Sequence, residues 1–445
     1  MKLALIALSG VRAYDRELTA IGLTLPGFVE RSKTIASLPS LGLLTLAGMT
    51  PGDIEVDYIE FDGETPADGM AGQYDAVAIS SFSARIKDAY ALARQCRAAG
   101  IRVILGGLHV TARPEEAGAC ADTIVIGEAE PVWPQVIDDL RHDALKPVYD
   151  ARATPFDLAD APMPRFDLLD PSRYNRLTVQ TQRGCPFDCE FCAASIRLSP
   201  GYRVKPVEKV IAEIRAIKAI WPRPFIEFAD DNTFANKSHS KQLLRALAHE
   251  GVRWFTETDI SIARDERLLE LMADSGCAQV LIGLENPSRS ALHGVETRGN
   301  WKAKQTAFYR EAIERIQRRG IRVNGCFVLG LDGADKTSFS QIARFVRDSG
   351  LYDVQVTILT PFPGTPLYDR LKREGRLLHD GAWERCTLFD LNFQPRGMSV
   401  DEFVTQFHEL VRELYSESST AMRRAAFAAM RSAGKKSQPL PEATS

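Results

Sequence analysis

Residues 1–145 alternate short, nearly continuous apolar runs with stretches of helical periodicity. The apolar runs predict strands at Lys2–Leu8, Asp53–Phe61, Tyr74–Ser80, Arg102–Leu105 and Thr123–Ile126. A helical pattern between the third and fourth of these strands covers Lys87–Ala99. Strands that are apolar on both faces and alternate with helices are typical of a parallel sheet covered on both sides. We therefore predict an α/β fold that begins with a doubly wound, Rossmann-like domain over residues 1–145.

Residues 146–176 interrupt this alternation because they contain Pro155, Pro162, Pro164 and Pro171. Prolines at this density exclude a regular helix and favour extended backbone. We predict a Pro-rich linker between two domains here.

A second alternation of strands and helices begins at Leu177 and fills residues 177–395. Its six predicted strands are Leu177–Gln182, Phe225–Phe228, Trp254–Thr258, Val280–Leu284, Val323–Leu329 and Val354–Leu359. The helices predicted between them are Pro206–Ile220, Lys241–His249, Asp265–Asp274, Thr306–Arg318 and Ser338–Asp348. Residues 396–436 are predicted to form a helical C-terminal region, and the composition of residues 437–445 favours a disordered tail.

The last predicted helix starts near Thr420 and has a weakly amphipathic pattern. Its apolar stripe comprises Met422, Ala426, Ala429, Met430 and Ala433, and its cations are Arg423, Arg424, Arg431, Lys435 and Lys436. We expect a solvated tail helix, with peripheral contact to an anionic lipid surface as the alternative.

The composition is that of an ordinary globular protein, with 45% hydrophobic residues, 25% charged residues and a net charge of -3. This balance argues against a basic nucleic-acid-binding surface. The apolar run at the N-terminus is too short to span a bilayer and predicts a buried strand. We expect a cytoplasmic protein, because thiols without paired spacing fit a reducing compartment.

Three of the eight cysteines are Cys185, Cys189 and Cys192, in the spacing C-x3-C-x2-C directly after a predicted strand. A tetrahedral zinc site would need a fourth Cys or His at a recognisable spacing. The next Cys is Cys277, and the nearest following His is His239. Three thiolates on one short loop instead suit a [4Fe-4S] cluster with one iron left open.

The segment Thr181-Gln182-Arg183-Gly184-Cys185-Pro186-Phe187-Asp188-Cys189-Glu190-Phe191-Cys192 resembles the signature loop of radical S-adenosylmethionine (SAM) enzymes. The resemblance implies that the three cysteines hold the cluster and that its open iron chelates SAM. It also implies reductive cleavage of SAM to a 5'-deoxyadenosyl radical, and contact between Phe191 and the adenine. The fold implied for residues 177–395 is the partial (β/α)6 barrel of that family.

Carboxylates recur where the predicted barrel strands end, which is where α/β barrels gather their chemistry. By resemblance, Asp230 and Asp231 stand where the family receives the SAM amine, and Glu285 stands where it contacts the ribose or methionine of SAM. Glu257 and Asp259 lie at a third strand end, and for them we favour a structural role. The alternative for every one of these residues is helix capping, which Asp performs well.

The N-terminal domain resembles the cobalamin-binding domain of B12-binding radical SAM enzymes. The matching pieces are Leu38–Leu44, Ser80–Ser83 with Ser81, Gly106-Gly107-Leu108-His109 and Val125–Glu130. The resemblance implies cobalamin binding near Ser81, Gly106 and Gly107. The D-x-H-x-x-G loop that ligates cobalt in many B12 proteins is absent, since no His precedes His109. We interpret His109 as a polar loop residue, with a cofactor or substrate contact as the alternative.

These observations predict a radical SAM enzyme with a [4Fe-4S] cluster, SAM and cobalamin as cofactors and a one-electron reductant as partner. The leading hypothesis is C-methylation of an unactivated carbon in a lipid, natural product or tetrapyrrole-like small molecule. One alternative is radical cyclisation, oxidation or rearrangement, with the N-terminal domain as scaffold. Another is a non-catalytic cobalamin or SAM sensor. Methylthiolation of tRNA is disfavoured, because the chain has no second cysteine triad and no basic C-terminal RNA-binding domain.

Overall fold

The computed structural model describes residues 1–8, 10–11, 13–21, 38–61, 69–70, 72–194, 197–198 and 201–436. The chain divides into two compact units. Among the described residues, the first comprises 1–21, 38–231 and 360–394, and the second comprises 232–359 and 395–436. The first unit thus contains the predicted N-terminal domain together with the cysteine loop.

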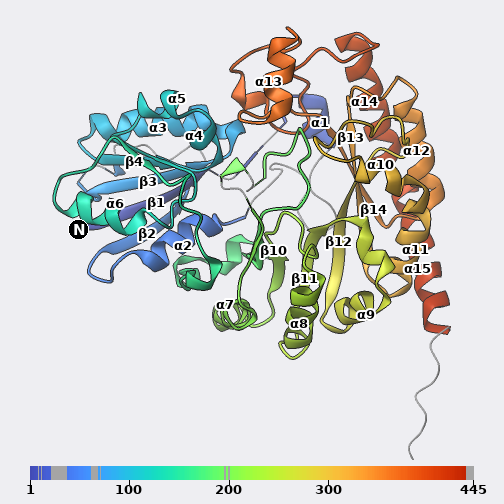
Figure 1. Cartoon of the computed structure of the whole chain (residues 1–445), viewed down its shortest axis with the longest axis horizontal. Helices are drawn as coiled ribbons and strands as arrows, with labels where there is room; N and C mark the ends of the chain where they lie inside the picture. Colours follow the sequence, from blue (N-terminus) through green and yellow to red (C-terminus); the bar gives the residue numbers. More distant parts are fainter. Residues whose placement is uncertain are drawn as a thin grey trace, which may run out of the picture. The chain divides into compact units, whose positions relative to one another are not determined.

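The predicted doubly wound domain is confirmed as a parallel sheet of six strands in the order β2-β1-β3-β4-β5-β6 (Figure 1). The strands are β1 (Lys2–Leu8), β2 (Glu55–Glu60), β3 (Ala76–Ser81), β4 (Arg102–Gly106), β5 (Thr123–Ile126) and β6 (Val148–Asp150). The strand order reverses at β1 and β3, so their carboxyl ends form the crevice where such sheets bind ligands. The short strand β6 lies within the segment that the prolines predict as linker.

Alternate residues of β1 enter two separate cores, which explains why this strand is apolar throughout. Ala4, Ile6 and Leu8 pack with α3 (Ile86–Ala98) and α5 (Pro114–Gly118). Leu3, Leu5 and Ala7 pack on the opposite face with residues of α2 (Leu41–Met49) and α6 (Trp133–Arg141). Burial on both faces requires a continuous apolar run, as the sequence pattern predicts.

The Pro-rich segment contains no α-helix among residues 151–176, all of which the structure describes. It forms three short 3₁₀ turns at Leu158–Asp160, Phe166–Leu168 and Pro171–Arg173. Asp157 and Asp170 cap the first and third turns by accepting backbone N–H groups. The predicted exclusion of regular helix is confirmed.

The second sheet also has six strands, in the order β14-β13-β12-β11-β10-β7. They are β7 (Leu177–Val179), β10 (Phe225–Phe228), β11 (Arg253–Thr258), β12 (Cys277–Glu285), β13 (Arg322–Leu329) and β14 (Asp353–Ile358). The alternating helices include α7 (Val207–Ile220), α8 (Lys237–Leu247), α9 (Glu266–Asp274), α10 (Trp301–Gln305), α11 (Tyr309–Arg318) and α12 (Ser338–Ser349). The ladders β7–β10 and β11–β12–β13–β14 are parallel, which confirms the predicted strand–helix alternation.

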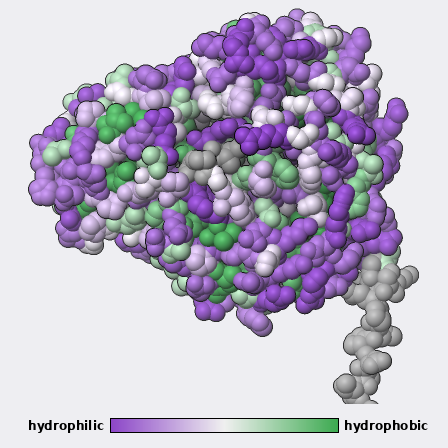
Figure 2. All heavy atoms as spheres, viewed as in Figure 1, coloured by the Kyte–Doolittle hydropathy of each residue, from purple (hydrophilic) through white to green (hydrophobic). Residues whose placement is uncertain are grey.

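Two short strands, β8 (Gln182–Arg183) and β9 (Arg203–Val204), form an antiparallel hairpin between β7 and α7. After the second sheet come α13 (Pro366–Arg373), α14 (Val400–Tyr415) and α15 (Glu417–Lys436). None of the described helices is long and apolar enough to cross a membrane. The face shown in Figure 2 is largely hydrophilic, with small apolar patches.

The expectation that the last helix is a solvated tail is wrong, because α15 packs on α11 and α14 within the second unit. Phe427 is buried with its ring centroid 5.0 Å from that of Tyr352, and the Arg424 guanidinium lies 3.6 Å from the same ring. Arg423 is also buried and donates to the Leu414 carbonyl at 2.7 Å. Two of the cations proposed for lipid contact therefore face the protein interior.

This packing predicts unequal effects of truncating two apolar residues of α15. Phe427→Ala should lower the free energy of unfolding by about 3 kcal/mol, because it removes a buried ring from a packed interface. Met422→Ala, at a position that is 56% exposed, should change the free energy by at most about 0.5 kcal/mol. Urea denaturation of both variants measures the difference. Equal, small effects would contradict the docked helix.

Candidate active site

The three motif cysteines lie on the connection between β8 and β9. All eight cysteines belong to the described part of the chain, and none of them forms a disulfide. Cys189 is buried, whereas Cys185 and Cys192 are partly exposed. The pKa of Cys192 is raised to about 11, mainly by burial and to a smaller extent by the nearby Asp231 and Cys185. The thiols at 185 and 192 are therefore electrostatic neighbours, and a bound cation would stabilise their ionised form.

The start of this cysteine loop is fixed by backbone geometry. Gly184 has φ +91°, and a Cβ at this position would lie 2.1 Å from the Gly201 carbonyl oxygen. The Gly184 N–H donates to Asp231 Oδ2 at 3.0 Å. Only glycine can bring the two ends of the loop this close together at this φ.

Arg197 organises the other side of the loop. Its guanidinium donates to the carbonyls of Cys192 at 3.0 Å and Cys189 at 3.3 Å, and to Asp188 Oδ1 at 3.2 Å. The Cys192 N–H also donates to the Cys189 carbonyl at 3.1 Å. These bonds hold the backbone of the loop that carries the three cysteines.

Asp230 anchors the chain that leads into the loop. Its Oδ1 accepts the N–H groups of Thr181 at 2.8 Å and Gln182 at 3.1 Å, and its Oδ2 accepts the Thr181 hydroxyl at 2.5 Å. Its side chain is buried. The structure thus gives Asp230 a positioning role upstream of Cys185, and its predicted contact with SAM stays a prediction, as does that of Asp231.

Three thiolates on one loop fit a [4Fe-4S] cluster with one iron left open. Among the described residues, no group of three or more His, Cys, Asp and Glu side chains converges as a single metal ion would require. A cubane cluster binds each thiolate at a different iron, so its ligands stand further apart. Cys185, Cys189 and Cys192 would hold it.

The residues predicted to bind cobalamin lie at the carboxyl edge of the first sheet. Ser81 ends β3 and donates to the Phe82 carbonyl at 2.9 Å, while Gly106 ends β4. Gly107 has φ +106°, and a Cβ there would lie 3.3 Å from Ser80 Oγ. These small residues leave the backbone accessible at this edge, which fits the close approach of a corrin ring.

The interpretation of His109 as a polar loop residue is wrong. It lies in α4 (Leu108–Ala112) and is 1% exposed. Its ring contacts those of Trp383 and Tyr90 edge-on, at centroid distances of 5.3 Å and 6.2 Å. Its Nδ1 lies 3.1 Å from Ser83 Oγ. Burial lowers the pKa of His109 to about 4, so the ring is a neutral core residue at neutral pH.

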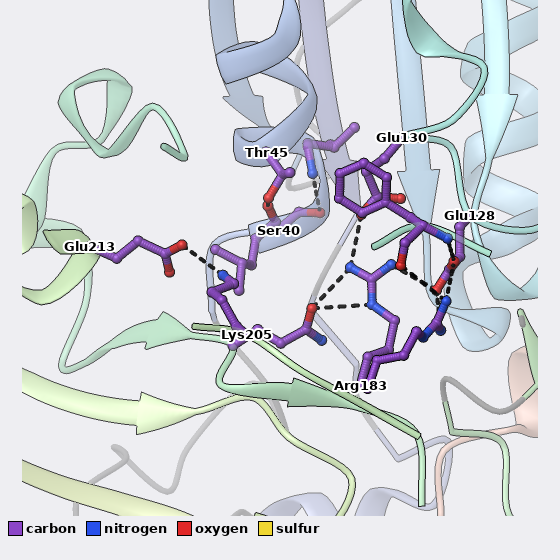
Figure 3. Close-up of polar contacts among 12 residues, drawn as sticks. Ser40, Thr45, Glu128, Glu130, Arg183, Lys205 and Glu213 are labelled. Atoms are coloured by element: carbon purple, nitrogen blue, oxygen red, sulfur yellow. Dashed lines mark hydrogen bonds and ion pairs between the residues drawn. The ribbon is translucent and has the colours of Figure 1, made fainter. Parts of the chain in front are cut away.

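A buried ion-pair network, missed by the sequence analysis, joins the cysteine-loop hairpin to the loop after β5 (Figure 3). Glu128 accepts hydrogen bonds from Arg183 and Arg203, and Glu130 accepts one from Arg183. Burial alone would raise the pKa of Glu128, but the hydrogen bonds from Arg203 and Arg183 outweigh it and lower the pKa. The charges compensate one another over a long sequence separation, which no local pattern reveals.

Glu285 lies in the second unit, at the end of β12, where the ladder to β13 shifts register. It has φ +58°, a conformation rare for a residue with a side chain. Its carboxylate is buried and pairs with Lys302 Nζ at 2.7 Å. Local strain of this kind is concentrated at functional sites. Lys302 was not predicted, because its partner lies on a different element.

Asp259 acts as a cap, which was the alternative to a functional role. It caps the 3₁₀ turn Ile260–Arg264 by accepting the Ser261 N–H at 2.7 Å, and it accepts the Asn232 amide at 2.8 Å. Glu257 is exposed on β11. Cys277 begins β12, and Cys386 is buried in the core of the first unit.

One face of the ladder β11–β14 carries buried amides that the sequence analysis also missed. The cross-strand registers Leu281↔Asn324 and Cys326↔Gln355 place alternate residues of these strands on one face, and Gln279 shares the face of Leu281. Within the described residues, both polar atoms of Gln279 and Asn324 and Oε1 of Gln355 have no hydrogen-bond partner. A polar residue within an otherwise apolar strand was the sequence signal that could have revealed these buried amides.

The geometry of Gly184 predicts that adding one methyl group removes the cluster. Gly184→Ala should prevent the loop from closing, because the new Cβ collides with the Gly201 carbonyl. Gly201→Ala is the matched control, since it has φ +101° but nothing within 4 Å of its Cβ. It should cost only about 1 kcal/mol of stability. Iron content after anaerobic reconstitution distinguishes them, and full iron occupancy of Gly184→Ala would contradict this geometry.

The neutral, buried His109 predicts a pH dependence of stability. The unfolded chain protonates this residue near its ordinary pKa of about 6.5, whereas the folded protein does so only near pH 4. The unfolded state therefore binds more protons between these values, and stability falls as the pH falls. His109 should contribute a loss of about 2 kcal/mol between pH 7 and pH 5.

His109→Phe retains an aromatic ring and removes this titration, so the same variant measured at both pH values is the control. Urea denaturation followed by tryptophan fluorescence reports the free energy of unfolding. An identical pH dependence in the parent and in His109→Phe would show that His109 is not buried as a neutral ring.

Comparison with known families assigns both halves of the chain. Residues 179–346 match the Radical SAM superfamily and residues 33–137 match the B12 binding domain. Residues 365–443 match a domain of unknown function, DUF4070.

Curated relatives cover most of the chain. Bacteriochlorophyllide d C-12(1)-methyltransferase of Chlorobaculum tepidum is 27% identical over 87% of this chain and 84% of its own length. Hopanoid C-2 methylase of Rhodopseudomonas palustris is 28% identical over 78% of this chain and 66% of its own length.

A solved structure, the radical SAM methyltransferase TsrM from Kitasatospora setae, covers 98% of this chain and 99% of its own with a TM-score of 0.69 and 15% identity, which shows a shared fold. The chain therefore carries a radical SAM domain at residues 179–346 and a B12 binding domain at residues 33–137.

Proposed function

We propose that this protein is a cobalamin-dependent radical SAM methyltransferase that methylates carbon. The observation that carries the proposal is the placement of the cysteine loop and the carboxyl edge of the B12 binding domain in one compact unit, joined through Glu128. The relatives named as methyltransferases support the reaction class. When bound, the cofactors supply a methyl group and a carbon-centred radical, which side-chain acids and bases cannot generate.

The residues of this chain contribute binding and orientation. Cys185, Cys189 and Cys192 would hold the cluster, while Gly184 and Asp230 shape the backbone that presents them. Gly106 and Gly107 open the carboxyl edge of the sheet for the corrin. Glu285 is ion-paired with Lys302 and is thereby held in one orientation, and its contact with the ribose or methionine of SAM stays a prediction.

For the substrate we propose a small molecule with several hydrogen-bonding groups. Buried amides without partners are costly, and Gln279, Asn324 and Gln355 carry such atoms on one face of the β11–β14 ladder. A substrate with carbonyl, carboxylate or amine groups would satisfy them, whereas a plain hydrocarbon skeleton would not. Among the classes expected from the sequence, these amides favour a tetrapyrrole-like or other polar natural product over an apolar lipid.

Anaerobic reconstitution with iron, sulfide and hydroxocobalamin tests the proposal. The protein should bind about four irons and four sulfides and show the absorption spectrum of a bound corrinoid. Under reduction with SAM it should release 5'-deoxyadenosine. Cys189→Ala should lose iron, whereas Cys96→Ala, which alters a thiol in the apolar core of the first unit, should retain it.

The three measurements separate the alternatives. Iron with no bound corrinoid would contradict the methyltransferase reading and favour radical cyclisation or rearrangement. Both cofactors without SAM cleavage would favour a sensor. No iron in the parent protein would overturn the assignment of the cysteine loop.

A further inference from the structure

The cysteine loop is closed at its base by two arginines that face each other. Arg183 on β8 and Arg203 on β9 are directly paired across the antiparallel hairpin. Residues 184–202 form the connection between them, so these arginines mark the start and the end of the loop that carries the cysteines. Any group that holds both guanidiniums holds the loop at both ends.

Glu128 is that group. Its Oε1 accepts from Arg183 Nη1 at 2.8 Å and from Arg203 Nη2 at 2.8 Å, and its Oε2 accepts from Arg203 Nη1 at 3.0 Å. Oε2 also accepts the Phe156 N–H at 2.8 Å. The side chain of Glu128 is 1% exposed. This carboxylate therefore has both oxygens engaged by rigid donors, with Arg203 bound in a bidentate manner.

Further contacts fix the orientation of Arg183 (Figure 3). Its Nη2 donates to Glu130 Oε1 at 2.8 Å and to Gln180 Oε1 at 2.9 Å, and its Nε donates to Gln180 at 3.2 Å. Two guanidiniums and two carboxylates leave no net charge in this buried network. Since the planar guanidinium binds in a defined fork, a shift of the hairpin relative to the loop after β5 would break several bonds at once.

The position of Glu128 gives this joint a functional meaning. It follows the end of β5 at Ile126 and so lies at the edge of the sheet where doubly wound folds bind their ligands. A single residue, Gly184, separates Arg183 from Cys185. Buried ion pairs are weak sources of stability but can define a specific geometry. Reactions between bound groups depend steeply on their separation. A joint at this place would therefore control the distance between the two bound cofactors.

We propose that Glu128 is a positioning residue that clamps both ends of the cysteine loop to the B12 binding domain and thereby fixes the separation of the cluster from the corrin. The proposal rests on the proposed function, because it requires both cofactors to bind. The folded chain sets the distance between the cluster and the corrin, so this distance does not depend on the substrate.

The test is magnetic. A reduced [4Fe-4S] cluster and cob(II)alamin each carry an unpaired spin, and the interaction of two nearby spins splits their electron paramagnetic resonance signals according to their separation. The parent protein, loaded with both cofactors and reduced with dithionite, should give one well-resolved splitting. Glu128→Gln retains the shape of the side chain but removes the charge that holds both arginines. It should retain iron and corrinoid and lose the single resolved splitting.

Glu213→Gln is the matched control. Glu213 is also buried and pairs with Lys205 at 2.6 Å, next to β9, but it lies on α7. Among the described residues, it forms no hydrogen bond or ion pair with Glu128 or Glu130. This variant should lower thermal stability and leave the splitting of the parent unchanged. If Glu128→Gln does not fold, Arg203→Lys takes its place, because it retains the charge and loses the fork; it should also lose the single splitting.

Each outcome decides the proposal. A parent-like splitting in Glu128→Gln or its substitute, with both cofactors bound, would overturn it. So would a loss of splitting in Glu213→Gln, since any buried charge would then suffice, and so would a fully loaded parent without splitting. Failure of the parent to bind corrinoid is a separate result, because it removes the proposed function itself.

Discussion

A carboxylate that is withdrawn from water must find cations, and for Glu128 these come from the two ends of the cysteine loop. This requirement ties the loop after β5 to the hairpin β8–β9. Burial would raise the pKa of Glu128, but the hydrogen bonds from the two arginines lower it by more. Glu128 therefore stays ionised and keeps its bonds to both arginines. The geometry of the cysteine loop relative to the first sheet follows from this electrostatic balance.

Within the loop, backbone groups rather than side chains set the shape. Gly184 allows two backbone segments to approach, Asp230 collects N–H groups upstream, and Arg197 collects carbonyls downstream. Because these bonds use main-chain atoms, the thiols are not needed to hold the loop together. The same division appears at the first sheet, where Gly107 shapes the edge by its conformation. In both places the conformation of the backbone sets the local shape.

The strands could be predicted because their signals are local, and the pattern that predicts the cysteine site is local as well. Burial on both faces makes β1 apolar throughout, and the spacing of Cys185, Cys189 and Cys192 is visible in a single loop. His109 was misinterpreted because its surroundings come from Trp383, far along the chain, and a polar residue after two glycines resembles a loop. The packing of α15 was missed for a related reason. The sequence around Arg424 is typical of a surface cation, whereas in the structure its guanidinium contacts the ring of Tyr352. Contacts between distant segments, including those of Glu128, leave no periodic trace.

In the second unit, several buried polar side chains have no hydrogen-bond partner among the described residues. On β11–β14 the face packed against helices is apolar, whereas the opposite face carries Gln279, Asn324 and Gln355 with polar atoms that have no partner in the described chain. A sequence selected only for stability would replace them by apolar residues of similar shape, because an unsatisfied buried amide is destabilising. Glu285, held by Lys302 in a strained conformation, adds a second cost at the end of β12. The unsatisfied amides on this face therefore support the proposal of a polar substrate.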